Sequence, residues 1–278
     1  MIMRTAKKLL GVSMFSSVFE SYNSNPSLLI LEIKDKNQPE AEALAWLAVE
    51  KKETYDKCSD NTVNKASLNV TYQRLDRDTH HDKKGSFCAG YSRRTNTVSL
   101  TYSDPDSSSG AVFLDLPGFE GQRIGSYLMN VIVQWVQQWP EATVKSIKLA
   151  SGQATHDNKK RRNRFYEQFG IVFNYIDEEL SAGLSSPMLV KDLNTVDSWK
   201  QNIVEHNLIH FLENMLASKE SLVSKIDFLE KSNKSLIEER NKADAAPIRW
   251  VIQTLYNKYA KFSIVLVPLI LAGWFFIK

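Results

Sequence analysis

The stretch from Val112 to Met129 holds the residues best placed to do chemistry. A short apolar run passes through a turn rich in glycine into a helical segment that begins near Ile124. The first N–H groups of a helix have no partner inside the helix, and the positive end of the helix dipole lies beside them. Gly121 and Gly125 remove side chains where an anion must approach the backbone. The pattern predicts a cradle for a pyrophosphate group.

This stretch resembles the phosphate loop of the GNAT superfamily of acyl-CoA-dependent N-acetyltransferases, which is written [Q/R]-x-x-G-x-[G/A]. Glu120-Gly-Gln-Arg-Ile-Gly125 aligns with that loop, and Leu116-Pro117 precedes it. Glu120 stands where the family has Gln or Arg, and Arg123 replaces the first motif glycine. A carboxylate near a pyrophosphate is unfavourable, and the Arg123 guanidinium could partly offset it. The resemblance implies acetyl-CoA as co-substrate, held by Leu116, Gly121, Gln122, Arg123, Ile124, Gly125, Ser126 and Asn158.

A second resemblance lies downstream, in the segment 163–173, where Gly170 suits the end of a helix. In the family, the tyrosine that corresponds to Tyr166 often protonates the departing CoA thiolate, and a phenol with a pKa near ~10 is a suitable acid for this step. The alternative is that Tyr166 only packs on the sheet. Asp115 lies on the strand beside the expected acetyl site, but side chains alternate along a strand, so next to Leu114 and Leu116 it could point to the other face. The general base therefore stays unassigned, and water could take this role.

The densest basic cluster, Lys159-Lys-Arg-Arg-Asn-Arg164, has three open interpretations. It could contact the phosphates of the CoA nucleotide, form a solvated helix face, or attract anionic lipid headgroups. His206 and His210 stand at i and i+4, a spacing that can share a metal ion. No motif supplies a third ligand, so a solvated helix face is the preferred interpretation and no metal is predicted.

Strand and helix signals alternate through the first two-thirds of the chain, which predicts an α/β fold with a GNAT-like mixed central sheet flanked by helices. The expected domain covers 27–190, after an N-terminal segment 1–26, and the resemblance covers about 28–180. Strands are expected at 28–33, 66–74, 86–93, 97–102, 111–116 and 144–150. Helices are expected at 39–52, 124–138 and 159–168.

A helical stalk is predicted over 191–246, because 199–242 contains neither Gly nor Pro. Apolar residues recur there at the spacing of a coiled coil, which favours a two-stranded parallel coil and hence a homodimer. The alternative is a single amphipathic helix packed on its own domain. The expected seam consists of Leu212, Met215, Lys219, Leu222, Ile226, Leu229, Asn233 and Leu236.

The sixteen residues 262–277 carry no charge and are flanked by Lys261 and Lys278. They would span ~24 Å as a helix, which predicts a C-terminal transmembrane anchor in membrane lipid, preceded by a juxtamembrane helix at 247–261. The alternative is a buried core helix. Basic residues are more numerous before the span than after it, which places the N-terminal domain in the cytoplasm.

Composition narrows the function further. The net charge of +3, from 35 basic and 32 acidic residues, is too small to argue for a nucleic-acid partner. Two cysteines, Cys58 and Cys88, do not form a disulfide framework and are expected as reduced thiols. The sequence therefore predicts a membrane-tethered N-acetyltransferase that acts on an unidentified amine. The alternative is a non-catalytic adaptor that keeps the GNAT fold and is held at the membrane.

Overall fold

The computed structural model describes residues 24–75, 84–106, 118–153 and 158–259 of the 278. The chain divides into two compact units, Met1–Phe211 and Leu212–Lys278. The first unit holds a mixed sheet and the helices packed on it. The second unit holds most of one long helix and a shorter helix after it.

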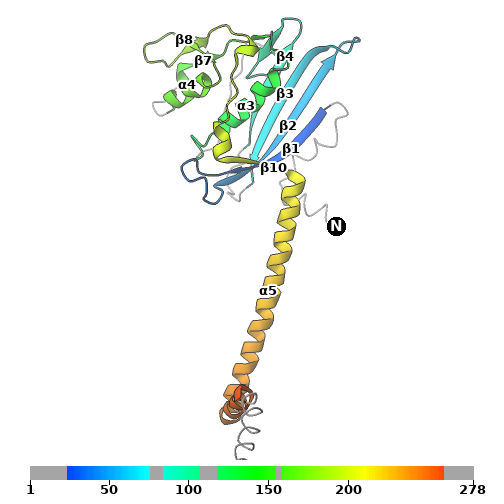
Figure 1. The fold of residues 1–278 in the computed structure, drawn as a ribbon. Coiled ribbons are helices and arrows are strands. Elements are labelled where there is room, and N and C mark those ends of the chain that lie inside the picture. Colours follow the sequence, from blue (N-terminus) through cyan, green and yellow to red (C-terminus); the bar gives the residue numbers. More distant parts are fainter. Residues whose placement is uncertain (1–23, 76–83, 107–117, 154–157, 260–278) are drawn as a thin grey trace, which may run out of the picture. The chain divides into compact units, whose positions relative to one another are not determined.

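The central sheet of the first unit has seven strands in the order β10-β1-β2-β3-β4-β5-β6 (Figure 1). β5 and β6 are parallel, and every other neighbouring pair is antiparallel. The strands are β1 (Ser24–Ile33), β2 (Ala45–Lys57), β3 (Val63–Arg74), β4 (Lys84–Ser92), β5 (Thr97–Ser99), β6 (Thr143–Val144) and β10 (Ile203–Asn207). The predicted α/β class with a mixed sheet is confirmed.

One face of this sheet forms the core. Leu31 pairs with Leu47, and Val49 pairs with Tyr72, and all four side chains are buried. Side chains alternate between the two faces of a strand, so this register puts the apolar residues of four strands on one side. The opposite face carries polar residues such as Thr71.

The helix α3 (Ile124–Val136) packs on this apolar face against β3 and β4. Its chain then returns to the sheet as β6, parallel to β5, as a βαβ crossover requires. Aromatic rings secure the C-terminal side of the helix. Trp139 stacks on Tyr91 at 4.2 Å, and Trp135 donates from Nε1 to the Tyr55 hydroxyl at 3.1 Å.

A second, three-stranded sheet has the order β7-β9-β8. It consists of β7 (Lys148–Leu149), β8 (Phe173–Tyr175) and β9 (Gly183–Ser185), and α4 (Lys159–Glu167) precedes β8. Three short 3₁₀ helices complete this part: η1 (Ser151–Gln153), η2 (Val190–Asp192) and η3 (Ser198–Gln201). Beyond the two residue pairs of β5 and β6, the chain leaves the first sheet and enters the second.

Three sequence predictions were wrong. The expected helix at 39–52 is largely the strand β2, because Ala45, Leu47 and Val49 also alternate with period 2 and the strands on both sides supply hydrogen bonds. The expected strand at 144–150 is divided between β6 and β7. The stalk does not begin at 191, since 203–207 forms the edge strand β10. The expected strand at 111–116 lies outside the described residues.

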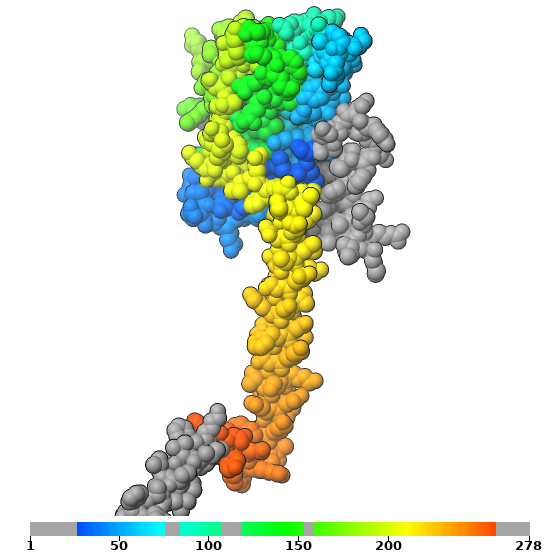
Figure 2. Space-filling model, turned by 45° about the vertical axis from the view of Figure 1, so that its right-hand side comes forward, coloured from blue at the N-terminus to red at the C-terminus, as the bar shows by residue number. Residues whose placement is uncertain are grey.

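The helix α5 (Leu208–Ala245) runs for 38 residues without a buried side chain. Its side chains are exposed (Figure 2), except for Leu208, Phe211 and Ala243, which are half-buried. A bend at Ala246 separates it from a helix at 247–259. Among the described helices, none combines the length and the apolar character needed to cross a bilayer. The expected anchor at 262–277 lies outside the described residues.

Candidate functional site

The loop 118–123 gives the N-terminus of α3 its geometry. Gly118, Gly121 and Arg123 all have positive φ, at 85°, 79° and 65°. Arg123 is the N-cap of α3 in a left-handed conformation, which a residue other than glycine seldom adopts, and its side chain does not cap the helix. A left-handed residue followed by right-handed ones turns successive N–H groups toward one point, where an anion can bind. Ile124, Gly125 and Ser126 supply these N–H groups.

Asn202 holds this loop in place. It is 1% exposed and follows η3. Its Nδ2 donates to the carbonyls of Lys34 at 3.0 Å and Gln122 at 3.1 Å, and its Oδ1 accepts from Arg123 at 3.2 Å. The Lys36 N–H also donates to Gln122 Oε1 at 3.0 Å. Nothing in the sequence pointed to Asn202, because it is about 80 residues from the loop and lies in a segment expected to be stalk.

The two residues that depart from the family pattern have separate partners. Glu120 is exposed, and its Oε2 accepts from the N–H of Gly118 at 2.9 Å. This contact turns the carboxylate back on its own loop. The Arg123 guanidinium contacts Asn202 instead. Arg123 therefore acts in anchoring the loop, whereas the sequence suggested that it offsets the charge of Glu120.

The C-terminal end of α4 meets the first turn of α3. Gln168 donates from Nε2 to Ser126 Oγ at 2.9 Å and to the carbonyl of Phe165 at 3.1 Å. These bonds tie the segment that carries Tyr166 to the N-terminus of α3. The two resemblances in the sequence thus belong to segments that are in contact.

Tyr166 is 7% exposed and packs edge-on against Phe165 at 4.9 Å and Phe173 at 5.5 Å. Burial raises the pKa of its phenol, and the positive charge of Arg162 partly opposes this rise. The phenol therefore keeps its proton near neutral pH. Packing on the sheet, the alternative from sequence, is present. It does not conflict with proton donation, since no described residue hydrogen bonds to the hydroxyl.

Part of the basic cluster is structural. Arg162 donates to the carbonyls of Ala150 at 3.2 Å and Ser181 at 2.8 Å, so it joins α4 to two loops. Lys159 lies 3.8 Å from Glu179. The remaining basic side chains, which are exposed, are Lys160, Arg161 and Arg164.

Asn158, a predicted cofactor contact, is the N-cap of α4 but makes no side-chain cap hydrogen bond. Its Oδ1 is buried and has no hydrogen-bond partner among the described residues. A buried acceptor without a donor is costly, so a ligand that offers an N–H or O–H group would be favoured there.

The two histidines do not lie on one helix, as the spacing suggested. His206 is on β10, and its Nε2 lies 2.9 Å from Glu32 Oε2, whereas His210 is in α5. Within the described part of the chain, no group of three or more His, Cys, Asp or Glu side chains could hold a metal ion. Both cysteines are free, with Cys58 exposed and Cys88 half-buried.

A polar trio beside the N-terminal half of α3 was not visible in the sequence. The Tyr127 hydroxyl donates to Glu205 Oε1 at 2.5 Å, and Lys51 Nζ lies 3.9 Å from the same oxygen. Burial lowers the pKa of Lys51, and burial together with Glu205 raises the pKa of Tyr127. The three residues come from β2, α3 and β10, so only strand pairing brings them together.

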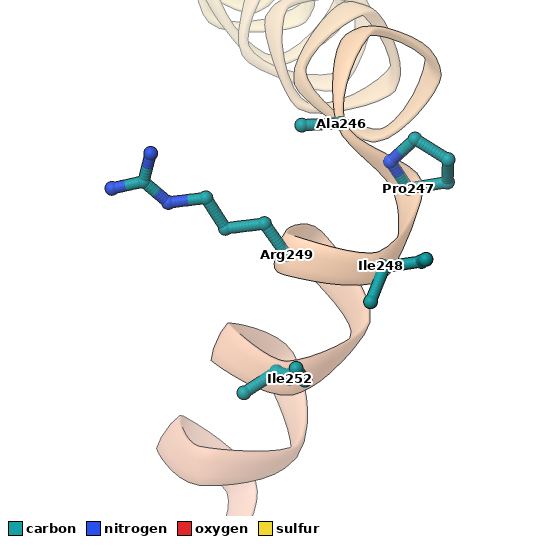
Figure 3. Close-up of a pocket in the computed structure, with 5 residues that line it drawn as sticks. All are labelled: Ala246, Pro247, Ile248, Arg249 and Ile252. Carbon is teal, nitrogen blue, oxygen red and sulfur yellow. The ribbon is translucent and has the colours of Figure 1, made fainter.

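The second unit contains a different surface feature at its bend. Ala246, Pro247, Ile248, Arg249 and Ile252 line an open hollow of about 480 Å³ (Figure 3). The Arg249 guanidinium extends away from Pro247 and Ile248. Proline suits the first turn of a helix, which explains why the new helix begins at this point.

This second helix is amphipathic. Ile248, Ile252, Leu255 and Tyr259 share one face and are exposed. At 100° per residue, Arg249 and Lys258 flank the two borders of this apolar face. No acidic residue occurs in 247–259.

Comparison with protein-family models gives no match, and comparisons with curated proteins and with solved structures give no significant similarity. The function is therefore argued from the geometry and from the resemblances in the sequence.

Proposed function

We propose that the first unit is an N-acyltransferase that takes its acyl group from acetyl-CoA. The observation that carries the proposal is the left-handed turn at Gly121 and Arg123, which delivers the chain into α3 beside the end of α4. Such a turn offers several N–H groups to one anion, and the helix dipole adds to the attraction. The pyrophosphate of CoA fits this chemistry.

In the proposed reaction, the acceptor amine attacks the thioester carbonyl. The C–N bond forms, the C–S bond breaks, and backbone N–H groups stabilise the negative charge on the carbonyl oxygen. Tyr166 gives its proton to the departing thiolate, and the ammonium group loses a proton to water. Burial raises the pKa of the Tyr166 phenol, which keeps it protonated but makes it a weaker acid, so the role rests on its place in the segment that Gln168 ties to the N-terminus of α3. The resemblance to the GNAT superfamily agrees with this assignment of roles.

A calorimetric titration of the full chain with acetyl-CoA tests the proposal. Gly125→Glu should abolish micromolar binding, since it puts a carboxylate at the centre of the N–H groups. Gly152→Glu is a matched control, because a side chain at Gly152 meets no atom within 4 Å. If the folded wild-type chain binds no acetyl-CoA, or if both variants bind it equally, the acyltransferase proposal is wrong.

A second candidate function is a non-catalytic adaptor, which the exposed carboxylate of Glu120 favours. This charge stands at the loop that would receive pyrophosphate. Glu120→Gln distinguishes the two candidates. It should tighten acetyl-CoA binding several-fold in an enzyme, whereas an adaptor binds no acetyl-CoA with either residue.

We also propose that the second unit is held at an anionic lipid surface. The apolar face of the helix 247–259 would enter the interface, while Arg249 and Lys258 at its borders reach the headgroups. The uncharged segment 262–277 would continue this attachment, with the first unit on the cytoplasmic side.

Site-specific labels test the lipid proposal in the full chain, after Cys58→Ser and Cys88→Ala remove the native thiols. A fluorophore on Ile252→Cys should be quenched by lipid-borne quenchers in phosphatidylserine vesicles. The same label on Asn257→Cys, on the polar face, should be quenched by iodide in water. Equal access of iodide to both positions would contradict a helix lying in the interface.

A further inference from the structure

We infer that α5 forms a parallel, in-register, two-stranded coiled coil with α5 of a second copy of this chain. The inference goes beyond the proposed function, because it rests on α5 alone. The seam residues with apolar side chains are all exposed, by 39% to 63%: Leu212, Met215, Leu222, Ile226, Leu229 and Leu236. A long exposed apolar seam on a helix indicates a surface that packs against another molecule.

The spacing of the seam identifies the partner as another helix of the same kind. Met215, Leu222, Leu229 and Leu236 recur every seven residues, which is the d position of a heptad. Of the a positions, Leu212 and Ile226 are apolar, and Lys219 and Asn233 are the two polar ones. A strict repeat of seven keeps such a seam in contact with a helix that repeats in the same way, through left-handed supercoiling. The surface of a globular partner has no such period.

Asn233 determines the orientation. It stands at an a position, where a parallel in-register pair places each residue opposite its own copy. The two Asn233 amides can then hydrogen bond to each other across the seam. In an antiparallel pair, an a residue faces d residues, and the amide would lie unpaired against leucine or methionine.

Charges beside the seam agree with the parallel arrangement. Lys225 at g and Glu230 at e are five residues apart, which is the spacing of an interhelical g–e pair. The next g and e residues, Ser232 and Ile237, carry no charge, and Glu239 and Asp244 occupy the pair after them and would repel. Arg240 reduces this repulsion, because its Nε lies 3.8 Å from Asp244 Oδ2 on the same helix.

Cysteine cross-linking of the full chain in detergent tests the inference, again with Cys58→Ser and Cys88→Ala. Leu222→Cys and Leu236→Cys, introduced separately, should each give a disulfide-linked dimer within minutes of mild oxidation. The two positions lie ~21 Å apart along the helix. An antiparallel pair can bring at most one of them to its own copy, so cross-linking at both positions requires the parallel register.

Lys231→Cys, on the outer f position, is the matched control and should cross-link at least ten-fold more slowly. Sedimentation of the uncross-linked full chain should give the mass of two chains. Cross-linking at only one d position would overturn the parallel orientation. Equal rates at all three positions, or a mass other than that of two chains, would overturn the two-stranded coil.

Discussion

Tyr166 illustrates how packing sets the chemistry of a single residue. The rings of Phe165 and Phe173 exclude water from its phenol, and this desolvation keeps the phenol protonated. A proton donor to a thiolate needs this state, which a phenol of ordinary pKa also has at neutral pH, and the raised pKa makes Tyr166 a weaker acid. The same packing makes the ring part of the core, so the residue serves both structure and the proposed reaction.

Tyr166→Phe keeps the ring contacts and removes the proton. We expect kcat for acetyl transfer to fall about 100-fold, with little change in KM for acetyl-CoA, because general acid catalysis contributes to the transition state alone. Steady-state kinetics with a competent amine measure this split. A loss of folding stability without a kinetic change would assign Tyr166 to packing only.

Asn202 is the residue on which the shape of the loop 118–123 depends. Asn202→Ala leaves the carbonyls of Lys34 and Gln122 and the guanidinium of Arg123 without their partner. We expect a loss of at least ~2 kcal/mol of unfolding free energy, measured in urea, and weaker acetyl-CoA binding. Asn64→Ala removes a hydrogen bond to Asp56 at the exposed surface and should cost less than ~1 kcal/mol. Equal costs would contradict the anchoring role.

Among the elements, the short connection after α4 depends most on one backbone conformation. Gly170 follows the helix with φ at 82°, and an added Cβ would lie 3.0 Å from the carbonyl oxygen of Asp192. Only glycine fits both requirements without strain. This turn directs the chain into β8 and so places the second sheet beside α4.

Three alanine substitutions separate backbone strain from contact. Gly170→Ala should cost about 2 kcal/mol or more of unfolding free energy, because it meets both strain and crowding. Gly118→Ala has the same positive φ but meets no atom within 4 Å, so its cost should be close to ~1 kcal/mol. Gly152→Ala meets neither problem and should be neutral. Denaturation in urea measures the loss of unfolding free energy for each variant. The expected order is Gly170→Ala, then Gly118→Ala, then Gly152→Ala, and another order would contradict the strain argument.

The polar layer of α5 should control how many helices associate. Asn233→Val removes the only amide at an a position between Leu212 and Leu236, so the seam loses the group that specifies two strands. We expect a higher melting temperature and a mixture that contains trimers or tetramers in sedimentation equilibrium. Ser235→Val, at the outer c position, should leave a dimer. A wild-type chain that already contains trimers would contradict the prediction.

At the scale of the first unit, buried phenols link stability to pH. Tyr127 and Tyr166 are 1% and 7% exposed, and burial raises the pKa of both. Above pH ~10 the unfolded chain releases these protons while the folded chain keeps them. Proton release therefore stabilises the unfolded state and lowers the free energy of unfolding. The contribution of the two phenols to the unfolding free energy is therefore fully present below pH ~10 and is lost as the pH rises above it.

We expect the unfolding free energy to drop by up to ~1.4 kcal/mol per pH unit for each of these phenols between pH ~10 and ~12. Tyr127→Phe removes one of them and should make the slope shallower. Urea denaturation at three alkaline pH values measures it. An unchanged slope in Tyr127→Phe would contradict the burial of a neutral phenol at this position.

Much of the organisation is readable in the sequence. A short apolar run located β1, runs bounded by polar or turn residues located β3, β4 and β5, and helical segments were predicted where α3 and α4 lie. These signals are local, because a strand or helix shows its buried face in its own residues. Gly121 also belongs to this group, since its positive φ is a local requirement that few other residues meet.

Other features were decided only by tertiary structure. The segment that forms β2 was predicted as a helix from its own residues. It is a strand because β1 and β3 lie on both sides of it and supply hydrogen bonds. His206 was expected in a helix but lies in β10 for the same reason, since hydrogen bonds to β1 outweigh the local helix preference. Asn202 and the trio around Glu205 depend on segments more than 75 residues apart. Contacts over such separations leave no periodic trace in the sequence, so only the folded chain shows which side chains hold the loop of the proposed site.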